Sequence, residues 1–258
     1  MTTLFNPNMS DADYRKAQGL SQSSLKTFLV SPAHYLASTE EVREPTKAMQ
    51  LGTAFHAVML QDNPSDFYAV QKKVDGRTKE GRAYNEQFAL ENAGKVIINE
   101  EEEHMLFSMK QSVMNHPLAS KLASSITHRE TALFGEYEGV KLKGLMDGYI
   151  ASEGIIVDYK SCEDASPSGF RKQIWDFRYD IQSIQYPWLV RNAGLRCSDF
   201  YFICIEKKPP FAVGVYKISE PSIKKSTDTW HNAILRFKDC TATGNFPAYS
   251  ESLVEIVL

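Results

Sequence analysis

Apolar residues recur at helical spacing in several stretches of the chain. Leu25, Phe28 and Leu29 follow a run of serines that can cap a helix, and the pattern stops at Pro32. Asn99 precedes four glutamates, an acidic first turn that suits the positive end of a helix dipole. These patterns predict a short helix before residue 32 and further helices over 46–60, 83–92, 99–116, 179–193 and 221–239. Proline 187 is expected to kink or split the helix over 179–193.

The middle of the chain changes to the alternating pattern of β-strands. Turn signals separate three such segments, which predicts three strands in hairpin succession, and two more strands follow the helix over 179–193. Helices before and after these strands predict a mixed α/β fold, a central mixed β-sheet flanked by helices. The predicted strands span 131–138, 140–150, 154–161, 199–206 and 211–218.

Composition narrows the class of protein. A chain of 258 residues with 43% apolar residues can bury one large core, so we expect a single domain over 1–258, with a poorly structured arm at 1–18 and a tail at 240–258. It has neither a stretch of about 20 apolar residues for a membrane helix nor a secretory signal pattern. The four cysteines are widely spaced, which argues against zinc or an iron–sulfur cluster and favours reduced thiols in the cytoplasm.

The net charge of −3 neither supports nor excludes a nucleic-acid partner. A protein that binds phosphate groups must then concentrate positive charge locally. The segment 71–82, QKKVDGRTKEGR, is one candidate, although a basic run of this kind is usually a solvated loop.

The segment KLKGLMDGYIASEGIIVDYKS carries the most chemistry. Side chains alternate along a strand, so Asp158 and Lys160 share one face, and a hairpin turn at 151–154 would bring Asp147 close to Asp158. Two neighbouring carboxylates repel each other unless a cation lies between them. Oxygen donors of this kind suit Mg²⁺, or Mn²⁺ as a substitute, with one or two ions. Lys160 could then position a water molecule or neutralise charge on a phosphate.

The spacing alone also fits a solvent-facing salt bridge in an antiparallel hairpin. Against that simpler interpretation, the GIIV run before Asp158 predicts a buried strand, and buried charges need partners.

The arrangement resembles the PD-(D/E)xK nuclease superfamily, with Asp147 as the first acid and Asp158, Tyr159 and Lys160 as the D-x-K element. Met146 stands where the superfamily has its proline. From about Tyr14 to the C-terminus the chain is most similar to the catalytic domain of RecE, the exodeoxyribonuclease VIII of phages and prophages. The similar stretches, in order, are LSQSSLKTFLVSPAHYL, MQLGTAFHAVML, DGRTKEGRAYNEQF, KGLMDGYI, IIVDYKS, YDIQSIQYPWLV, YFICIEKKPPFAVGVY and FPAYSE.

The resemblance implies further site residues. His56 would enter the metal site from a helix, and the main-chain carbonyl of Tyr159 would face the metal. Gln182 and Tyr186, one helical turn apart, would brace the catalytic lysine and contact the DNA backbone. Glu130 would be an extra acid at the edge of the sheet. Each has an ordinary alternative: a satisfied helix histidine, a solvated Gln182, a packed Tyr186 and a surface carboxylate. Near such a site the basic segment would contact DNA through Arg77, Lys79 and Arg82.

The resemblance also implies a function. It implies a Mg²⁺-dependent exonuclease that digests one strand of double-stranded DNA from 5′ to 3′ and leaves 3′ single-stranded ends for recombination in a bacterial host cell. It further implies a ring-shaped homo-oligomer, a tetramer, that works with a RecT-like single-strand annealing protein. Two alternatives stay open: an endonuclease of the restriction or repair type on the same core, and a non-catalytic DNA-binding module. The presence of both acids and the lysine argues against the non-catalytic module.

Overall fold

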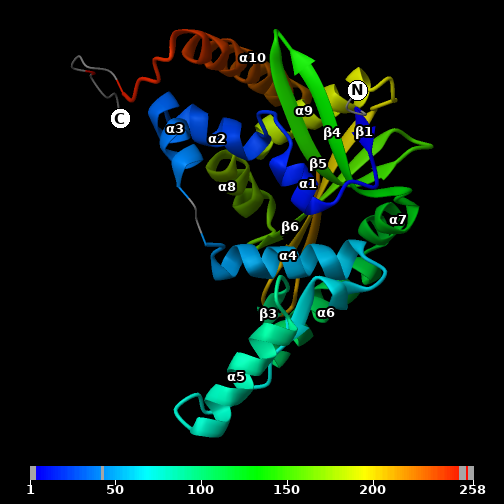
Figure 1. Ribbon diagram of the computed structural model, residues 1–258. Helices are drawn as coiled ribbons and strands as arrows, with labels where there is room; N and C mark the ends of the chain where they lie inside the picture. The colour runs from blue at the N-terminus through cyan, green and yellow to red at the C-terminus, as the bar shows by residue number, and fades with distance from the viewer. Residues whose placement is uncertain (1–3, 42–43, 250–253, 255–258) are drawn as a thin grey trace.

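A six-stranded mixed sheet forms the centre of the computed structural model, which describes residues 4–41, 44–249 and 254 (Figure 1). The strand order is β1-β4-β5-β6-β7-β8; β6 and β7 are parallel, and all other neighbours are antiparallel. This sheet, covered by helices, confirms the predicted fold class. The strands are β1 (Phe5–Asn6), β4 (His128–Tyr137), β5 (Val140–Ile150), β6 (Ile155–Cys162), β7 (Asp199–Glu206) and β8 (Val213–Tyr216).

The predicted helix starts agree with the caps in the structure. Ser21 and Thr46 cap the helices that follow them, and Asn99 forms a capping box with Glu102. The helices are α1 (Asp11–Lys16), α2 (Gln22–Val30), α3 (Pro32–Glu40), α4 (Lys47–Leu60), α5 (Lys79–Glu91), α6 (Glu100–Asn115), α7 (Pro117–Ser125), α8 (Pro167–Phe177), α9 (Tyr179–Asn192) and α10 (Glu220–Thr243). A small parallel pair, β2 (Tyr68–Val70) and β3 (Val96–Ile98), precedes α6.

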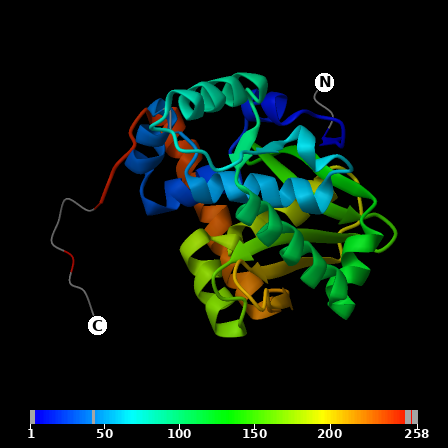
Figure 2. The same ribbon diagram turned by 90° about the horizontal axis from the view of Figure 1, so that it is seen from below.

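The sheet separates two hydrophobic cores. Helices α2, α9 and α10 pack on one face, where Ile156 of β6 is buried. Helices α4, α6 and α7 pack on the other face, against Val157 and Tyr159 of the same strand. The alternation predicted along β6 is therefore correct. Figure 2, seen from below, shows α5 lying outside α4, and in Figure 1 α5 projects away from the sheet.

Several boundaries differ from the predictions. Residues 5–16, expected in an unstructured arm, form β1 and α1, because Phe5 pairs with Leu133 and the Lys143 ammonium donates to carbonyl groups at the end of α1. Helix α9 continues through Pro187 without splitting. Helix α10 continues to Thr243, so a tail from residue 240 was wrong; of that tail, 250–253 and 255–258 lie outside the described residues.

The basic segment 71–82 is a loop only as far as Thr78. The Thr78 hydroxyl caps α5 by accepting from the Gly81 N–H, so Lys79 and Arg82 belong to the helix and not to a loop. Across the described part of the chain, every helix is too short or too polar to cross a membrane.

Two glycines offer a matched test of the packing. A Cβ on Gly144 of β5 would lie 2.6 Å from Cε1 of Tyr186, so Gly144→Ala should lower the free energy of unfolding by about 1–3 kcal/mol. Gly52 lies inside α4 with open space around it, so Gly52→Ala should raise that free energy by about 0.5–1 kcal/mol. Urea unfolding followed by circular dichroism measures both changes. Equal effects of the two substitutions would contradict the close contact at Gly144.

Candidate active site

Strands β5 and β6 form a hairpin that opens at Asp147. They pair from Ile150 with Ile155 to Gly148 with Val157. Beyond this last pair the ladder is replaced by a side-chain contact: the Tyr159 N–H of β6 donates to Oδ2 of Asp147 of β5 at 2.8 Å. A side-chain carboxylate thus accepts the hydrogen bond that a main-chain carbonyl accepts in a regular ladder. The hairpin expected from the turn at 151–154 is present, and it brings Asp147 to the strand that carries Asp158.

The neighbouring strand is distorted at the same level. Glu130 of β4 lies opposite Asp147 by register, between the pairs Arg129–Gly148 and Thr131–Met146, and it has a φ of 41°. A glutamate in the left-handed region is uncommon, and such strained residues cluster at functional sites. The sheet is therefore irregular on both sides of Asp147.

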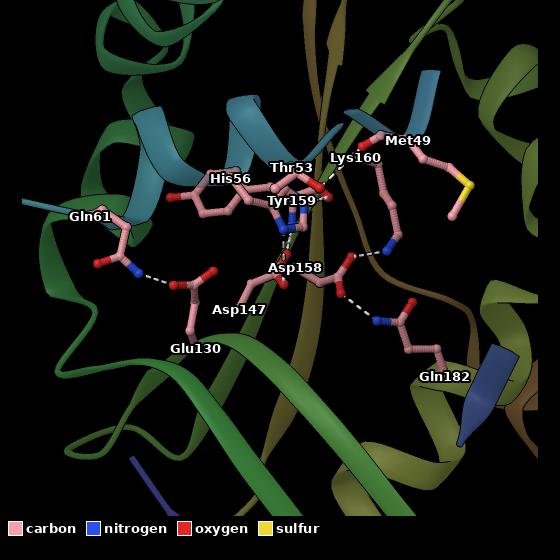
Figure 3. Close-up of polar contacts among 10 residues, drawn as sticks. All are labelled: Met49, Thr53, His56, Gln61, Glu130, Asp147, Asp158, Tyr159, Lys160 and Gln182. Atoms are coloured by element: carbon pink, nitrogen blue, oxygen red, sulfur yellow. Dashed lines mark hydrogen bonds and ion pairs between the residues drawn. The ribbon is translucent and has the colours of Figure 1, made fainter. Parts of the chain in front are cut away.

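Asp158 lies on the α9 side of the sheet with only 1% of its surface exposed. Its Oδ1 accepts from Nε2 of Gln182, and its Oδ2 lies 2.5 Å from the Lys160 ammonium (Figure 3). Burial raises the pKa of Asp158 to about 6; Lys160 opposes that rise, and the charge of Asp147 adds to it. The Oδ2 atom is buried without a well-aligned hydrogen bond, so its lone pairs are not fully satisfied.

Lys160 carries its charge in a largely buried position, with 14% of its side chain exposed. Burial acts to lower the pKa of Lys160, but the attractions of Asp158, Tyr179 and Asp147 outweigh it, and the pKa is raised. Its Nζ lies 4.5 Å from the centroid of the Tyr179 ring. The lysine is therefore held as an ammonium between a carboxylate and an aromatic face.

Helix α4 brings His56 over the opening between β5 and β6. Its Nδ1 lies 3.6 Å from Oδ1 of Asp147, and its Nε2 lies 3.3 Å from the carbonyl oxygen of Tyr159 (Figure 3). A neutral imidazole has one N–H, so it cannot donate to both oxygens at once. The centre therefore has more acceptors than donors, an arrangement that a bound cation would satisfy.

These donors fit a divalent metal ion. Asp147 and the Tyr159 carbonyl supply hard oxygen, which suits Mg²⁺ or Mn²⁺, and His56 adds an imidazole nitrogen. Within the described ranges, no three His, Cys, Asp or Glu side chains converge closely enough to form a metal cluster by themselves. A metal ion bound here would therefore need further donors such as the main-chain carbonyl; in this structure Asp158 contacts Lys160 and Gln182.

Glu130 lies beside this centre with a partner that the sequence analysis missed. It is half-buried and accepts from Nε2 of Gln61, just after the end of α4 (Figure 3). Burial raises the pKa of Glu130, Asp147 raises it further, and His56 opposes the rise. No sequence signal pointed to Gln61, because its position depends on how α4 crosses the sheet.

Gln182 and Tyr186 differ from their expected roles. Gln182 is buried and bonds to Asp158, so it holds the acid and not the lysine. Tyr186 is 8% exposed, and its ring packs over Gly144 in the core, so it makes no surface for a DNA backbone. Nearly all of α9 is buried. Tyr186, one turn beyond Gln182, therefore packs against β5 and is not at the surface.

The basic residues predicted to contact DNA do not join this centre. Arg77, Lys79 and Arg82 are exposed, and Nε of Arg77 pairs with Oδ1 of Asp75 at 3.0 Å. They lie at the start of α5, which projects away from the sheet in Figure 1. A cleft of about 660 Å³ opens beside His56 instead, and Arg15 and Arg129 are among the residues that line it.

Comparisons with known proteins agree with this geometry. The model of a family described as "PDDEXK-like domain of unknown function" (DUF3799) matches residues 21–255. None of the curated proteins matches the chain. A crystal structure from Eubacterium rectale, described as a "Putative exonuclease", has 15% sequence identity and a TM-score of 0.64, covering 97% of this chain and 96% of that one. A "phage related exonuclease" from Haemophilus somnus 129PT has 14% identity and a TM-score of 0.36, covering 90% and 100%. At 15% identity the first likeness shows a shared fold.

The raised pKa of Asp158 predicts a pH-dependent stability. The folded state binds this proton more tightly than the unfolded state, so the stabilisation is complete below pH 4 and is lost as the pH rises through about 6. Asp158→Asn removes this titration. The substitution also removes the counter-ion of Lys160, which lowers the stability at every pH. Between pH 4 and 7 the difference in unfolding free energy should nevertheless shift in the variant's favour, measured by urea unfolding in EDTA. A difference that stays constant with pH would contradict the raised pKa.

Proposed function

The chain belongs to the family of PDDEXK-like domains DUF3799, and on this premise we propose that it is a metal-dependent nuclease that hydrolyses phosphodiester bonds in DNA. One observation carries the proposal: Asp147 holds the main chain of the D-x-K strand through the Tyr159 N–H, with Asp158, Lys160 and His56 around the opening. A surface salt bridge would not be buried between two cores.

PDDEXK nucleases generally use divalent metal ions, and Mg²⁺, with Mn²⁺ as a substitute, is the ion we propose here. Asp147, His56 and the Tyr159 carbonyl would hold it, and Oδ2 of Asp158, which contacts the Lys160 ammonium in this structure, is a further oxygen donor in the proposal. The bound ion would polarise the phosphodiester and lower the pKa of a water molecule.

Lys160 supplies a fixed positive charge beside these donors. Strand β6 positions it, and Asp158 and Tyr179 hold its ammonium group in a largely buried setting, where charge interactions are stronger than in water. Such a group can orient a water molecule and neutralise charge that develops on a phosphate oxygen. Gln182 acts as a positioning residue, because it fixes Asp158 and not the reacting atoms.

The cleft beside His56 is the proposed path for the DNA strand. Arg15 and Arg129 line it, and each is paired with an exposed aspartate, Asp11 at 2.6 Å and Asp62 at 2.9 Å. Surface ion pairs contribute at most about 1 kcal/mol, so a phosphate group can replace either aspartate. Arg77, Lys79 and Arg82 would then contact DNA only further from the site.

Within this class we propose an exonuclease that digests one strand of duplex DNA from 5′ to 3′ and leaves 3′ single strands for recombination. The support is the RecE-like sequence stretches and the exonuclease description of the structural neighbour with the TM-score of 0.64. The same proposal includes a ring-shaped tetramer and a RecT-like annealing partner. A ring would keep DNA threaded and allow a chain with a net charge of −3 to gather its basic groups inside.

End-labelled DNA tests the polarity and the class together. The protein is incubated with linear duplex labelled at the 5′ or the 3′ end, and with closed circular duplex, in Mg²⁺ or EDTA. We expect early release of the 5′ label, intact circles and no cleavage in EDTA. Nicked or linearised circles would assign an endonuclease to the same site. If the protein binds DNA but does not cut it with any divalent ion added, it would be a binding module.

Lys160→Ala tests the charge assigned to the lysine. We expect metal binding to persist while the cleavage rate falls by at least about 10²-fold, as for the loss of one group that stabilises transition-state charge. Calorimetric titration with Mn²⁺ and single-turnover cleavage give the two quantities. Loss of metal binding in this variant would instead make Lys160 a structural residue.

A further inference from the structure

Two lysines and two aromatic rings form a continuous stack next to the site. The Lys160 ammonium lies 4.5 Å from the centroid of the Tyr179 ring, and Tyr179 is stacked on Phe177 with centroids 5.6 Å apart and an interplanar angle of 23°. The Lys26 ammonium lies over the Phe177 ring, 4.5 Å from its centroid. We call Phe177 and Tyr179 the aromatic ladder. It leads from the buried lysine to the surface, where Phe177 is 45% exposed.

The chain reaches this arrangement through a strained turn. Arg178, between the two rings, has a φ of 54° at the junction of α8 and α9. A left-handed non-glycine residue costs about 1–3 kcal/mol and persists only where its surroundings hold it. Here Gln22 donates to the carbonyl groups of Phe177 and Arg178 at 3.1 and 3.0 Å, and the Arg178 guanidinium grips the buried Asp180 at 2.9 and 3.0 Å.

We propose that the aromatic ladder is a stacking platform for a base of the DNA strand held in the active site, with Lys26 contacting the phosphate next to that base. This inference rests on the proposed nuclease function and names where its substrate strand is held. An exposed ring alone is ordinary. An exposed ring stacked toward a catalytic lysine and covered by a second lysine matches the pairing of stacking and charge by which proteins hold single strands.

Magnitudes favour an exchange of partners on Phe177. A lysine over a ring contributes about 0.5–1 kcal/mol where it is exposed and more where it is desolvated, and Lys26 is partly exposed. A base stacked on an aromatic side chain contributes about 1–3 kcal/mol. A base can therefore displace the Lys26 ammonium from the ring, and the freed ammonium gains a phosphate in return. Helix α8, which carries Phe177, also has two exposed cations, Arg171 and Lys172, and one acid, Asp176.

Helix α8 contains its own matched control. Trp175 is 49% exposed, similar to Phe177, and lies two residues earlier, but it makes none of the ring contacts found in the described part of the chain. The probe is a fluorescein-labelled duplex with a single-stranded end of a few nucleotides, in EDTA so that no cleavage occurs. We expect Phe177→Ala to raise the Kd about 5- to 100-fold, the range set by one stacked base. Trp175→Ala should change the Kd less than about twofold, and Phe177→Tyr should restore binding, since either ring offers a stacking face.

Lys26→Gln provides a second readout, the salt dependence of binding. It should reduce the slope of log Kd against log salt by about one, as for one lost phosphate contact. Equal effects of Phe177→Ala and Trp175→Ala, or a Phe177→Ala variant that binds like the wild type, would overturn the platform. Thermal melting of each variant excludes a loss of folding. Because binding is measured without cleavage, a wild type that binds DNA but never cuts it would refute the nuclease and leave the platform standing.

Discussion

The site depends on a single hydrogen bond between a side chain and the main chain. A buried N–H must find an acceptor, and for Tyr159 that acceptor is the Asp147 carboxylate on the next strand. The bond keeps β6 at a fixed distance from β5 where their ladder has ended, so the Tyr159 carbonyl and His56 meet beside Asp147. Glu130, held at a positive φ opposite Asp147, extends the same irregularity into β4.

The two hydrophobic cores determine how charge is distributed around this bond. Asp147 and His56 belong to the side covered by α4, whereas Asp158 and Lys160 face α9. Removing a carboxylate and an ammonium from water is unfavourable unless each keeps a close partner, and a buried pair rarely adds stability over apolar residues. The presence of the Asp158–Lys160 pair is thus better explained by a role in the proposed reaction than by a contribution to the stability of the fold. Gln182, itself buried on α9, fixes Asp158, although an apolar residue could have packed at this buried position.

Local patterns in the sequence were enough to predict strands β4 to β8, several helix caps and the faces of β6, but not the short strands β1, β2 and β3. The alternation around Asp158 placed Asp158 and Lys160 on one face, and the turn before it brought Asp147 to the same pair of strands, because those relations span few residues. The spacing did not predict that Asp147 faces α4 while Asp158 faces α9. Long-range packing was beyond such patterns. The crossing of α4 brings Gln61 to Glu130, and the burial of α9 on every side removes Tyr186 from the surface. The sequence analysis also missed helix α7, which starts directly after the end of α6, and helix α8; they span 9 and 11 residues.

Charge pairing constrains how this chain can hold a polyanion. Arg15, Arg77 and Arg129 each already pair with an aspartate, and the net charge is −3, so long-range attraction for DNA is weak. Affinity must then come from contacts made at short range, where phosphates replace aspartates and bases stack on exposed rings. Stacking does not depend on sequence, because every base has a π face. The proposed exonuclease would need that tolerance, since the strand in its site would change at each step.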